Sequence, residues 1–287
     1  MRYIKVFLSV ILFAFMAGCS KDSDFDLVKA DGLIIDHTTV KLGSIPSEWI
    51  SAAKENLSIA YSHTSHGSQL TEGMSGLISF KGESYAWNKG GANGALDLHD
   101  YAVNGDLGNP NRIAWSSGTR TYLAANPDVN VIIWSWCGQV SNATEADITT
   151  YLTLMNSLEY DFPEVKFVYM TGHLDGSGLT GNLHLRNEQI RDFCRKNQKI
   201  LYDFADIESY NPDGTYFGDK KPNDACDYDT NGDGSRDGNW ATEWQNSHAQ
   251  GKDWFNCSAA HTQPVNANQK AYAAWWLWAR LAGWNGK

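Results

Sequence analysis

Four short apolar runs in this chain each end in a cluster of polar side chains. The runs cover residues 57–61, 129–134, 165–170 and 200–204, and most of the segments between them have helical patterns. Strands that alternate with helices build a parallel sheet that is covered on both faces. The carboxyl ends of such strands lie at one edge, where ligands bind. The sequence therefore predicts an α/β fold, a three-layer α/β/α sandwich around a central parallel sheet, with a polar site at that edge.

The remaining patterns place the other elements. Apolar residues at helical spacing, such as Ile148, Leu152 and Met155, indicate amphipathic helices. Helices are predicted over 46–56, 67–80, 118–125, 144–160, 182–197 and 265–281, with a short strand at 33–35 and a loop over 81–117. Residues 207–256 form a long insertion rich in Gly, Asp and Asn, and loops of this length are usually functional or metal-bound.

The first residues have the composition of an export signal. Arg2 and Lys5 precede an apolar stretch, 6–16, that is too short to span a bilayer as a stable helix. Residues 16–19, Met-Ala-Gly-Cys, resemble the lipobox of bacterial lipoproteins, in which Cys19 would carry the lipid anchor. We therefore expect a signal peptide at 1–18, a polar tether at 19–32 and one domain over 33–287. The protein would be an exported lipoprotein of the outer membrane, exposed at the cell surface. The alternative is an ordinary secretory signal with a chance cysteine.

Composition limits the partners of this domain. The net charge of −10 excludes nucleic acid as a natural partner, because the phosphate backbone attracts basic surfaces. The chain has 12 tryptophans, whose flat faces can stack on sugar rings, and this favours a polysaccharide or oligosaccharide ligand. The alternative is that the tryptophans fill the core.

Cysteine usage allows a disulfide, because an exported chain meets oxidising conditions. Cys226 and Cys257 bracket the most irregular stretch and are the predicted pair. Cys137 and Cys194 are interpreted as buried thiols.

Two segments at opposite ends of the domain carry a resemblance to a known family. Residues 57–65 read as strand, tight turn and serine, which resembles the first block of the SGNH (GDSL-like) hydrolases, where the serine is the nucleophile. Ser65 takes that position, although His63 and Thr64 replace the usual Gly-Asp. Residues 258–264 resemble the final block, with His261 as the base and Ser258 where the family has aspartate. The resemblance implies an SGNH- or flavodoxin-like sandwich.

The resemblance also implies an activity. Gly138, with Gln139 or Asn142, falls where the family has its oxyanion donors, and Asp175 or Asp206 follows a strand end and would orient the base. The predicted function is a serine esterase that removes acyl groups from a polysaccharide. The alternative for Ser65 is that it hydrogen-bonds the turn before the next helix.

A second set of residues supports other functions. His63, His66, His173, Asp175 and His261 could bind zinc, but no spacing typical of a zinc site supports this. His63, His173 and Asp175 could instead serve a polysaccharide lyase or a glycosidase. Arginines available to hold an acidic sugar are Arg112, Arg120 and Arg186. A glycan-binding lipoprotein without catalysis is the remaining alternative.

The insertion contains a sequence with the spacing of a calcium loop. Oxygen ligands fall at positions 1, 3, 5 and 9 of the loop that begins at Asp229, with glycine at position 6 and the Ser235 carbonyl at position 7. Position 12 is Trp240 rather than glutamate, so Asp227 or Glu243 would complete the set. We predict a structural Ca²⁺. Its ligands would be Asp229, Asn231, Asp233, Ser235 and Asp237, with Asp227.

Overall fold

The structure is a computed structural model that describes residues 32–134, 136 and 138–287. The predicted signal peptide, Cys19 and nearly all of the tether lie outside the described residues, as does Cys137. In the described part of the chain, no helix has both the length and the apolar character needed to cross a bilayer.

Seven parallel strands of the described chain form one sheet in the order β1-β7-β6-β5-β2-β4-β3. The strands are β1 (Ile34–Ile35), β2 (Ser58–Ser62), β3 (Trp87–Asn88), β4 (Leu96–Asp100), β5 (Val131–Trp134), β6 (Lys166–Met170) and β7 (Ile200–Tyr202). β2 is central, with Ile59 opposite Leu98 of β4 on one side and Val131 of β5 on the other. The four apolar runs are therefore β2, β5, β6 and β7, as predicted.

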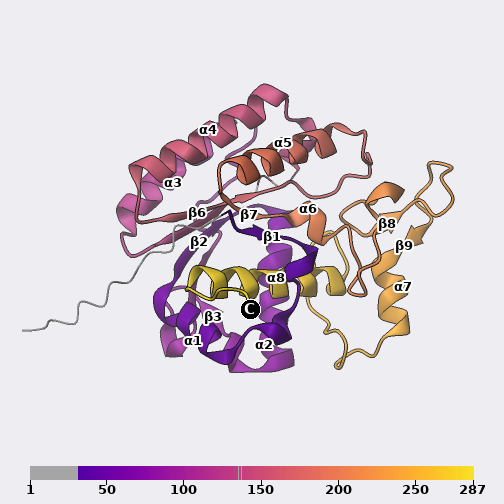
Figure 1. Cartoon of the computed structure of the whole chain (residues 1–287), viewed down its shortest axis with the longest axis horizontal. Coiled ribbons are helices and arrows are strands. Elements are labelled where there is room, and N and C mark those ends of the chain that lie inside the picture. Colours follow the sequence, from indigo (N-terminus) through magenta and orange to yellow (C-terminus); the bar gives the residue numbers. More distant parts are fainter. Residues whose placement is uncertain (1–31, 135, 137) are drawn as a thin grey trace, which may run out of the picture.

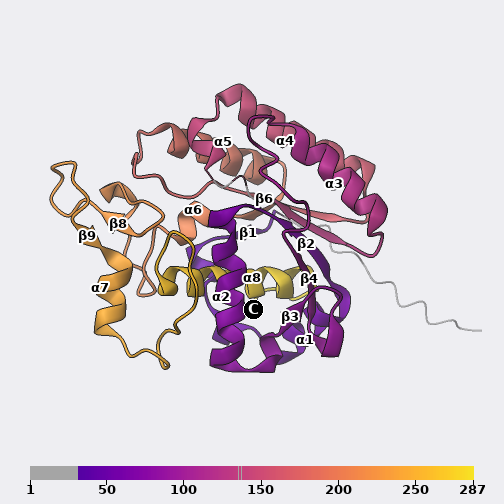
Figure 2. The same cartoon turned by 180° about the vertical axis from the view of Figure 1, so that it is seen from behind.

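Helices cover both faces of the sheet, which confirms the three-layer architecture (Figures 1 and 2). One layer holds α1 (Ser47–Asn56), α2 (Ser68–Lys81) and α8 (Pro264–Leu281), and α8 packs against α1 and α2. The other layer holds α3 (Ala114–Ala125), α4 (Glu145–Asp161) and α5 (Asn182–Lys196), with α4 packed against α3 and α5.

Successive side chains of each central strand point alternately into the two cores on either side of the sheet. In β2, Ile59 and Tyr61 join the core under α2 and α8, while Ala60 joins the core under α3 and α4. In β5, Ile133 joins the core under α2 and α8, and Ile132 joins the core under α3 and α4. Burial on both faces explains why these strands read as continuous apolar runs.

The region 81–117 differs from the predicted loop, because it contains β3, β4 and the start of α3. β4 lacks an apolar run: Leu96 and Leu98 alternate with Asp97 and His99. Partners from other elements satisfy the polar side chains, since Asp97 accepts a hydrogen bond from Ser58 Oγ and His99 Nδ1 contacts Tyr122 Oη at 2.5 Å.

The insertion is more ordered than the predicted loop. It follows α6 (Phe204–Ile207) and contains the 3-10 helix η7 (Gly218–Lys220), the antiparallel pair β8 (Asp227–Tyr228) and β9 (Gly238–Asn239), and α7 (Trp240–Ser247). Buried side chains give it a small core of its own, which includes Phe217, Tyr228, Trp240, Trp244 and Trp254. Figure 1 shows it as an extension at one side of the sandwich.

The predicted disulfide is wrong, because Cys226 and Cys257 are both free thiols. The two sulfurs belong to different cores. Cys226 lies in the core of the insertion, where its Sγ is 3.3 Å from Thr262 Oγ1. Cys257 packs against the core under α8, with its Sγ 3.6 Å from Asn268 Nδ2. Burial raises the pKa of each thiol to about 12, so both stay protonated at neutral pH. Cys194 is a buried thiol, as predicted.

The tryptophans are core residues, so their number carries no argument for a sugar ligand. Ten of the 12 are buried, and Trp49 and Trp87 are partly buried against the core under α8. The buried ones are Trp115, Trp134, Trp136, Trp240, Trp244, Trp254, Trp275, Trp276, Trp278 and Trp284.

Candidate functional site

The candidate site lies at the carboxyl edge of the sheet, beside its switch point. After β2 the chain forms β3 and β4 on one side of that strand, and then β5, β6 and β7 on the other side, so the direction of strand addition reverses at β2. Open α/β sheets bind ligands in the crevice at such a point. The segments that meet there are the 3-10 helix η3 (Ser65–Gly67) after β2, the turn before η6 (Gln139–Asn142) after β5, and the loop after β6.

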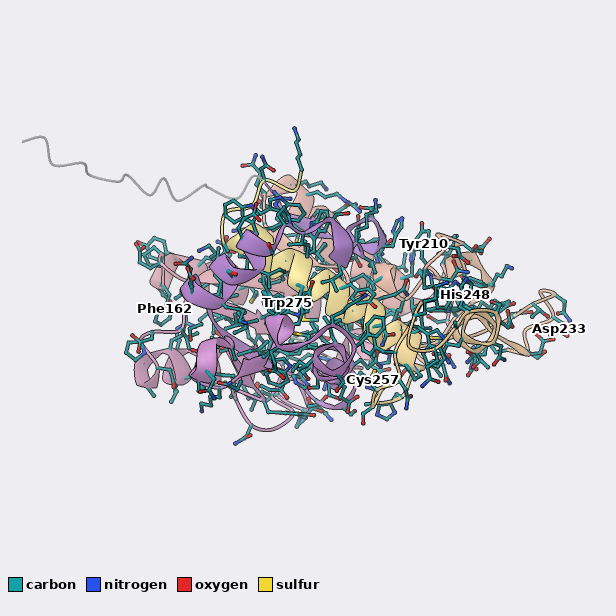
Figure 3. The ribbon with its side chains drawn as sticks, turned by 90° about the horizontal axis from the view of Figure 1, so that it is seen from below. Phe162, Tyr210, Asp233, His248, Cys257 and Trp275 are labelled. Atoms are coloured by element: carbon teal, nitrogen blue, oxygen red, sulfur yellow. The ribbon has the colours of Figure 1, made fainter. Side chains whose placement is uncertain are left out.

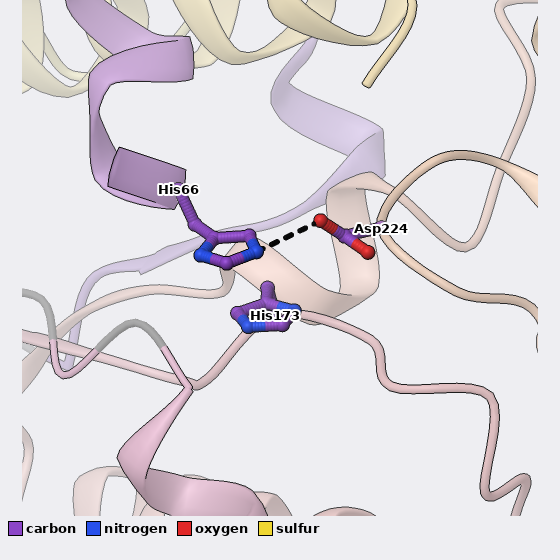
Figure 4. Close-up of side chains that lie close together, drawn as sticks. All are labelled: His66, His173 and Asp224. Carbon is purple, nitrogen blue, oxygen red and sulfur yellow. Dashed lines mark ion pairs between the residues drawn. The ribbon is translucent and has the colours of Figure 1, made fainter. Parts of the chain in front are cut away.

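Three histidines from distant parts of the chain stack on one another. The His66 ring lies 3.8 Å from the His173 ring and 4.2 Å from the His261 ring, with interplanar angles of 6° and 18°. We call these three residues the histidine stack. Figure 4 shows His66 above His173, with Asp224 at the side of the pair. The sequence grouped these histidines with His63 and Asp175, and the structure brings together three of the five.

Asp224 supplies the carboxylate of the site, and sequence analysis missed it. Its Oδ2 lies 3.0 Å from His66 Nε2, and its backbone N–H donates to the Leu174 carbonyl at 3.0 Å. Burial opposes ionisation of Asp224, but the hydrogen bond from His66 and the charges that His173 and His66 carry when protonated outweigh it and hold the pKa below its ordinary value. Asp224 sits in an irregular segment, where no periodic pattern marks it.

His173 is the side chain of the stack with an unused nitrogen. Its Nδ1 lies 2.9 Å from the Leu174 carbonyl oxygen, which can only accept, so Nδ1 carries the proton and Nε2 is the free acceptor. Nε2 is buried and has no hydrogen-bond partner among the described residues. It faces Gly138, where an added Cβ would lie 3.6 Å away. Burial, reinforced by His66, lowers the pKa of His173 against the opposing charge of Glu208. The ring is therefore neutral at pH 7.

His63 has a structural role instead. Its Nδ1 lies 2.8 Å from the Thr64 carbonyl and its Nε2 lies 2.8 Å from Asp100 Oδ1. The ring is held between Tyr61 and Tyr101, with centroids 4.2 and 4.1 Å away. Because both nitrogens are engaged, His63 fixes the turn after β2 and does not fit the role of a lyase base.

A buried ion pair connects the segments that carry the stack. Lys270 Nζ lies 2.7 Å from Glu208 Oε2, and both side chains are fully buried. Lys270 also donates to Gln69 Oε1, and Glu208 Oε1 accepts from the Leu174 backbone N–H. Gln69 Nε2 in turn donates to the Ala260 carbonyl at 2.7 Å. We call Gln69, Glu208 and Lys270 the buried network.

Each arm of the buried network ends close to one histidine. Gln69 follows His66 by one turn, Leu174 follows His173 directly, and Ala260 precedes His261. The network therefore fixes the three segments of the stack relative to one another. The sequence signal for this network is Lys270, a lysine on the apolar side of the last helix.

Ser65 and His261 are both at this edge but are not joined. Ser65 is exposed at the start of η3, and within the described residues no hydrogen bond links it to His261. His261 is exposed, has φ of +63° and covers the His66 ring. Asp175 Oδ1 accepts from the Ser177 N–H at 2.9 Å, and no described hydrogen bond joins Asp175 to His261. Asp206 binds His37 instead.

Of the predicted oxyanion donors, the structure brings Gly138 to the stack. Gln139 donates from its side chain to Asp106 and from its backbone to the Trp136 carbonyl. Asn142 is exposed at the end of η6 and contacts none of the three histidines through a described hydrogen bond. Gly138 therefore fits the oxyanion role better than the two side chains.

The stack favours proton transfer over metal binding. One potential ligand atom each from His66, His173 and Asp224 lies within 4.8 Å of the others. The two rings are parallel within 6°, however, so their in-plane lone pairs do not converge on one ion.

The carboxylates of the predicted calcium loop accept hydrogen bonds from neighbouring residues of the insertion. Asp229 accepts from the backbone N–H groups of Gly232 and Gly234 at 2.7 and 2.8 Å. The other carboxylates are engaged in the same way: Asp233 accepts from Ser235 and Asn231, Asp237 from Thr230, and Asp227 from Asn239. In the described structure its carboxylates do not converge as a set of three. Figure 3 places Asp233 at the outer end of the insertion. Calcium binding stays a prediction.

Comparison of the chain with protein-family models, with curated proteins and with solved structures found no match. The class of the protein is therefore given by its own structure: a three-layer α/β/α domain with a histidine-rich site at the carboxyl edge of a parallel sheet.

Proposed function

We propose that this protein is a hydrolase, a serine esterase that removes acyl groups from a carbohydrate. The observation that carries the proposal is the buried Nε2 of His173, which has no partner within the described chain and belongs to a neutral ring. A neutral imidazole with an unshared lone pair is suited to act as a general base near neutral pH. Its position at the switch point of the sheet supports this role, because open α/β sheets bind ligands there.

The proposed reaction begins at Ser65. Its Oγ attacks the ester carbonyl carbon, and its proton passes to His173 Nε2. Backbone N–H groups of Ser65 and Gly138 stabilise the oxyanion. The sugar alkoxide leaves with the proton from His173, and water then attacks the acyl-enzyme by the same route. The negative charges of Asp224 and Glu208 favour the imidazolium that forms transiently on His173.

The resemblance to the SGNH hydrolases supports this assignment in part. The three-layer fold, the serine after β2 and the histidine before the last helix occur in the order which that family shows. The proposal differs in its base, because His173 offers an unused nitrogen at the site while His261 covers His66. His261 remains the alternative base.

A pocket beside the β2–α2 connection supports a sugar substrate. It measures about 460 Å³ and is lined by Ser68, Glu72, Asp100, Tyr101 and Ser258, among others. The Tyr101 side chain is 45% exposed, so its ring can cover an apolar sugar face. The two carboxylates can accept hydrogen bonds from hydroxyl groups.

The arginines do not support a uronic acid substrate. Arg112 contacts the Gln139 carbonyl, Arg120 pairs with Asp161, and Arg186 donates to Gln189. Since all three are engaged elsewhere, the lyase alternative lacks the cations that would hold an acidic sugar.

The proposal predicts acetate release from an acetylated polysaccharide. The wild-type protein should release acetate, and Ser65→Ala should lower the rate by at least about 100-fold, because the nucleophile is lost. Ser84→Ala, at an exposed serine of the 3-10 helix η4 (Glu83–Tyr85), is the matched control and should keep full activity. Equal rates for Ser65→Ala and the wild type would contradict the proposed nucleophile.

We also propose that the loop from Asp229 to Asp237 binds a structural Ca²⁺. Calcium should raise the melting temperature and EDTA should lower it, because an ion that binds only the folded state stabilises it by mass action. Asp233→Ala should abolish the calcium effect, whereas Asp192→Ala, at an exposed position on α5, should not. A melting temperature that is equal in calcium and in EDTA would contradict calcium binding.

Export as an outer-membrane lipoprotein anchored through Cys19 is proposed on the sequence of residues 1–19 alone.

A further inference from the structure

We propose that a second pocket, at the carboxyl ends of β6, β7 and β1, binds a neutral oligosaccharide and forms a subsite for the carbohydrate chain. The proposal deepens the proposed function and depends on it for the link to catalysis. The pocket measures about 470 Å³, within the range of roughly 300–1,000 Å³ that is typical of small-ligand sites. It is distinct from the pocket beside Tyr101, and the two share no lining residue.

The pocket offers an aromatic surface. Tyr216 is 40% exposed, and its ring lies 5.0 Å from the Tyr210 ring. Tyr210 is stacked at 3.5 Å on His37, which holds it in place. An added Cβ at Gly218 would lie 2.2 Å from Tyr216 Oη, so the tyrosine rests directly on the backbone. A fixed, partly exposed ring of this kind can cover the apolar face of a sugar.

Carboxylates supply acceptors around that surface. One oxygen of Asp36 accepts from Thr38, and one oxygen of Asp175 accepts from the Ser177 N–H. An ionised carboxylate has about four lone-pair sites, so each of these anchored groups can accept further hydrogen bonds from the hydroxyl groups of a ligand.

The charges of the lining disfavour an anionic ligand. Arg191 binds both oxygens of Asp203, at 2.6 and 2.7 Å. Arg195 pairs with Asp192 at 3.4 Å. The lining therefore has no unpaired arginine in the described structure, while Asp36 and Asp175 add negative charge. Neutral hydroxyl groups fit this lining, and uronic acids would be repelled.

The loop after β6 connects this pocket to the catalytic edge. Leu174 accepts from His173 Nδ1 through its carbonyl and also lines the pocket. Asp175 follows directly. A sugar chain whose ester lies at His173 would therefore continue over this loop into the pocket.

Isothermal titration with unacylated oligosaccharides tests the subsite without any turnover, so esterase activity and subsite binding can fail separately. Neutral xylo-, manno- and gluco-oligosaccharides, an oligogalacturonate and spermidine are titrated into the wild-type protein. We expect at least one neutral oligosaccharide to bind, and Tyr216→Ala to weaken its binding at least tenfold. Asp36→Asn keeps the side-chain shape and should weaken binding less. Tyr160→Ala, at a tyrosine that is 86% exposed on α4, is the matched control and should bind normally.

Circular dichroism first establishes that each variant is folded, and Tyr216→Phe, which retains the ring, should keep binding if Tyr216→Ala fails to fold. Binding of oligogalacturonate or spermidine in place of neutral sugars would overturn the proposal. So would undiminished neutral-sugar binding by Tyr216→Ala, or no neutral-sugar binding by the wild type.

Discussion

Lys270→Met will lower the free energy of unfolding by about 3–5 kcal/mol, because it leaves Glu208 as an unpaired charge in a fully buried position. Urea denaturation followed by circular dichroism measures the change. Lys196→Met is the matched control, since that lysine is 75% exposed and pairs with Asp192 at the surface. Its effect should stay within about 0.5 kcal/mol.

The double variant Lys270→Met with Glu208→Leu separates the two parts of this effect. Replacing both charges by apolar groups removes the unpaired charge, so most of the lost stability should return. Activity should not return, because Leu174 and Gln69 lose the partners that fix the histidine stack. If Lys270→Met is as stable as the wild type, the buried network does not hold these segments together.

His173→Asn will lower kcat/KM for ester hydrolysis by about 10²–10⁴-fold, the usual contribution of a general base. His248→Asn is the matched control, because that histidine lies in the insertion, where its ring stacks on Trp244 at 3.8 Å. His261→Asn distinguishes the two candidate bases. A larger loss in His261→Asn than in His173→Asn would assign the base to His261.

The same residue sets the expected pH dependence. The base must be neutral, and its pKa is lowered from 6.5, chiefly by burial, so the acid limb of kcat/KM should lie below pH 6.5. The stability of the folded protein should also decrease as the pH falls. Between the folded pKa and 6.5 the unfolded chain binds a proton that the folded chain does not, so the contribution of His173 to stability falls as pH falls through this window. An acid limb above pH 6.5 would contradict His173 as the base.

The sequence predicted the central fold because burial on both faces leaves a strong signal. β2, β5, β6 and β7 are apolar runs, and the helices between them have clear periodicity. β4 was missed because its polar positions alternate and are satisfied by hydrogen bonds to Ser58 and Tyr122, which lie far away in the chain.

The sequence predicted the edge of the sheet at which the site lies, but not which of its residues contact one another. His66, His173 and His261 were all candidates, yet only folding shows that they stack. Asp224 and Glu208 lie in irregular segments without a pattern of their own, and the partner of Lys270 in the last helix is known only from the fold. The prediction of a Cys226–Cys257 disulfide was wrong for a similar reason. Two cysteines that bracket an irregular segment of the chain do not for that reason lie in the same core.

Labelling with a fluorophosphonate probe, followed by peptide mapping, tests the central claim most directly. The wild-type protein should carry the probe on the peptide that contains Ser65, and Ser65→Ala should carry none. His173→Asn should react much more slowly than the wild type. A wild-type protein that stays unlabelled, or a Ser65→Ala variant that is labelled as fast as the wild type, would contradict an activated serine at this site.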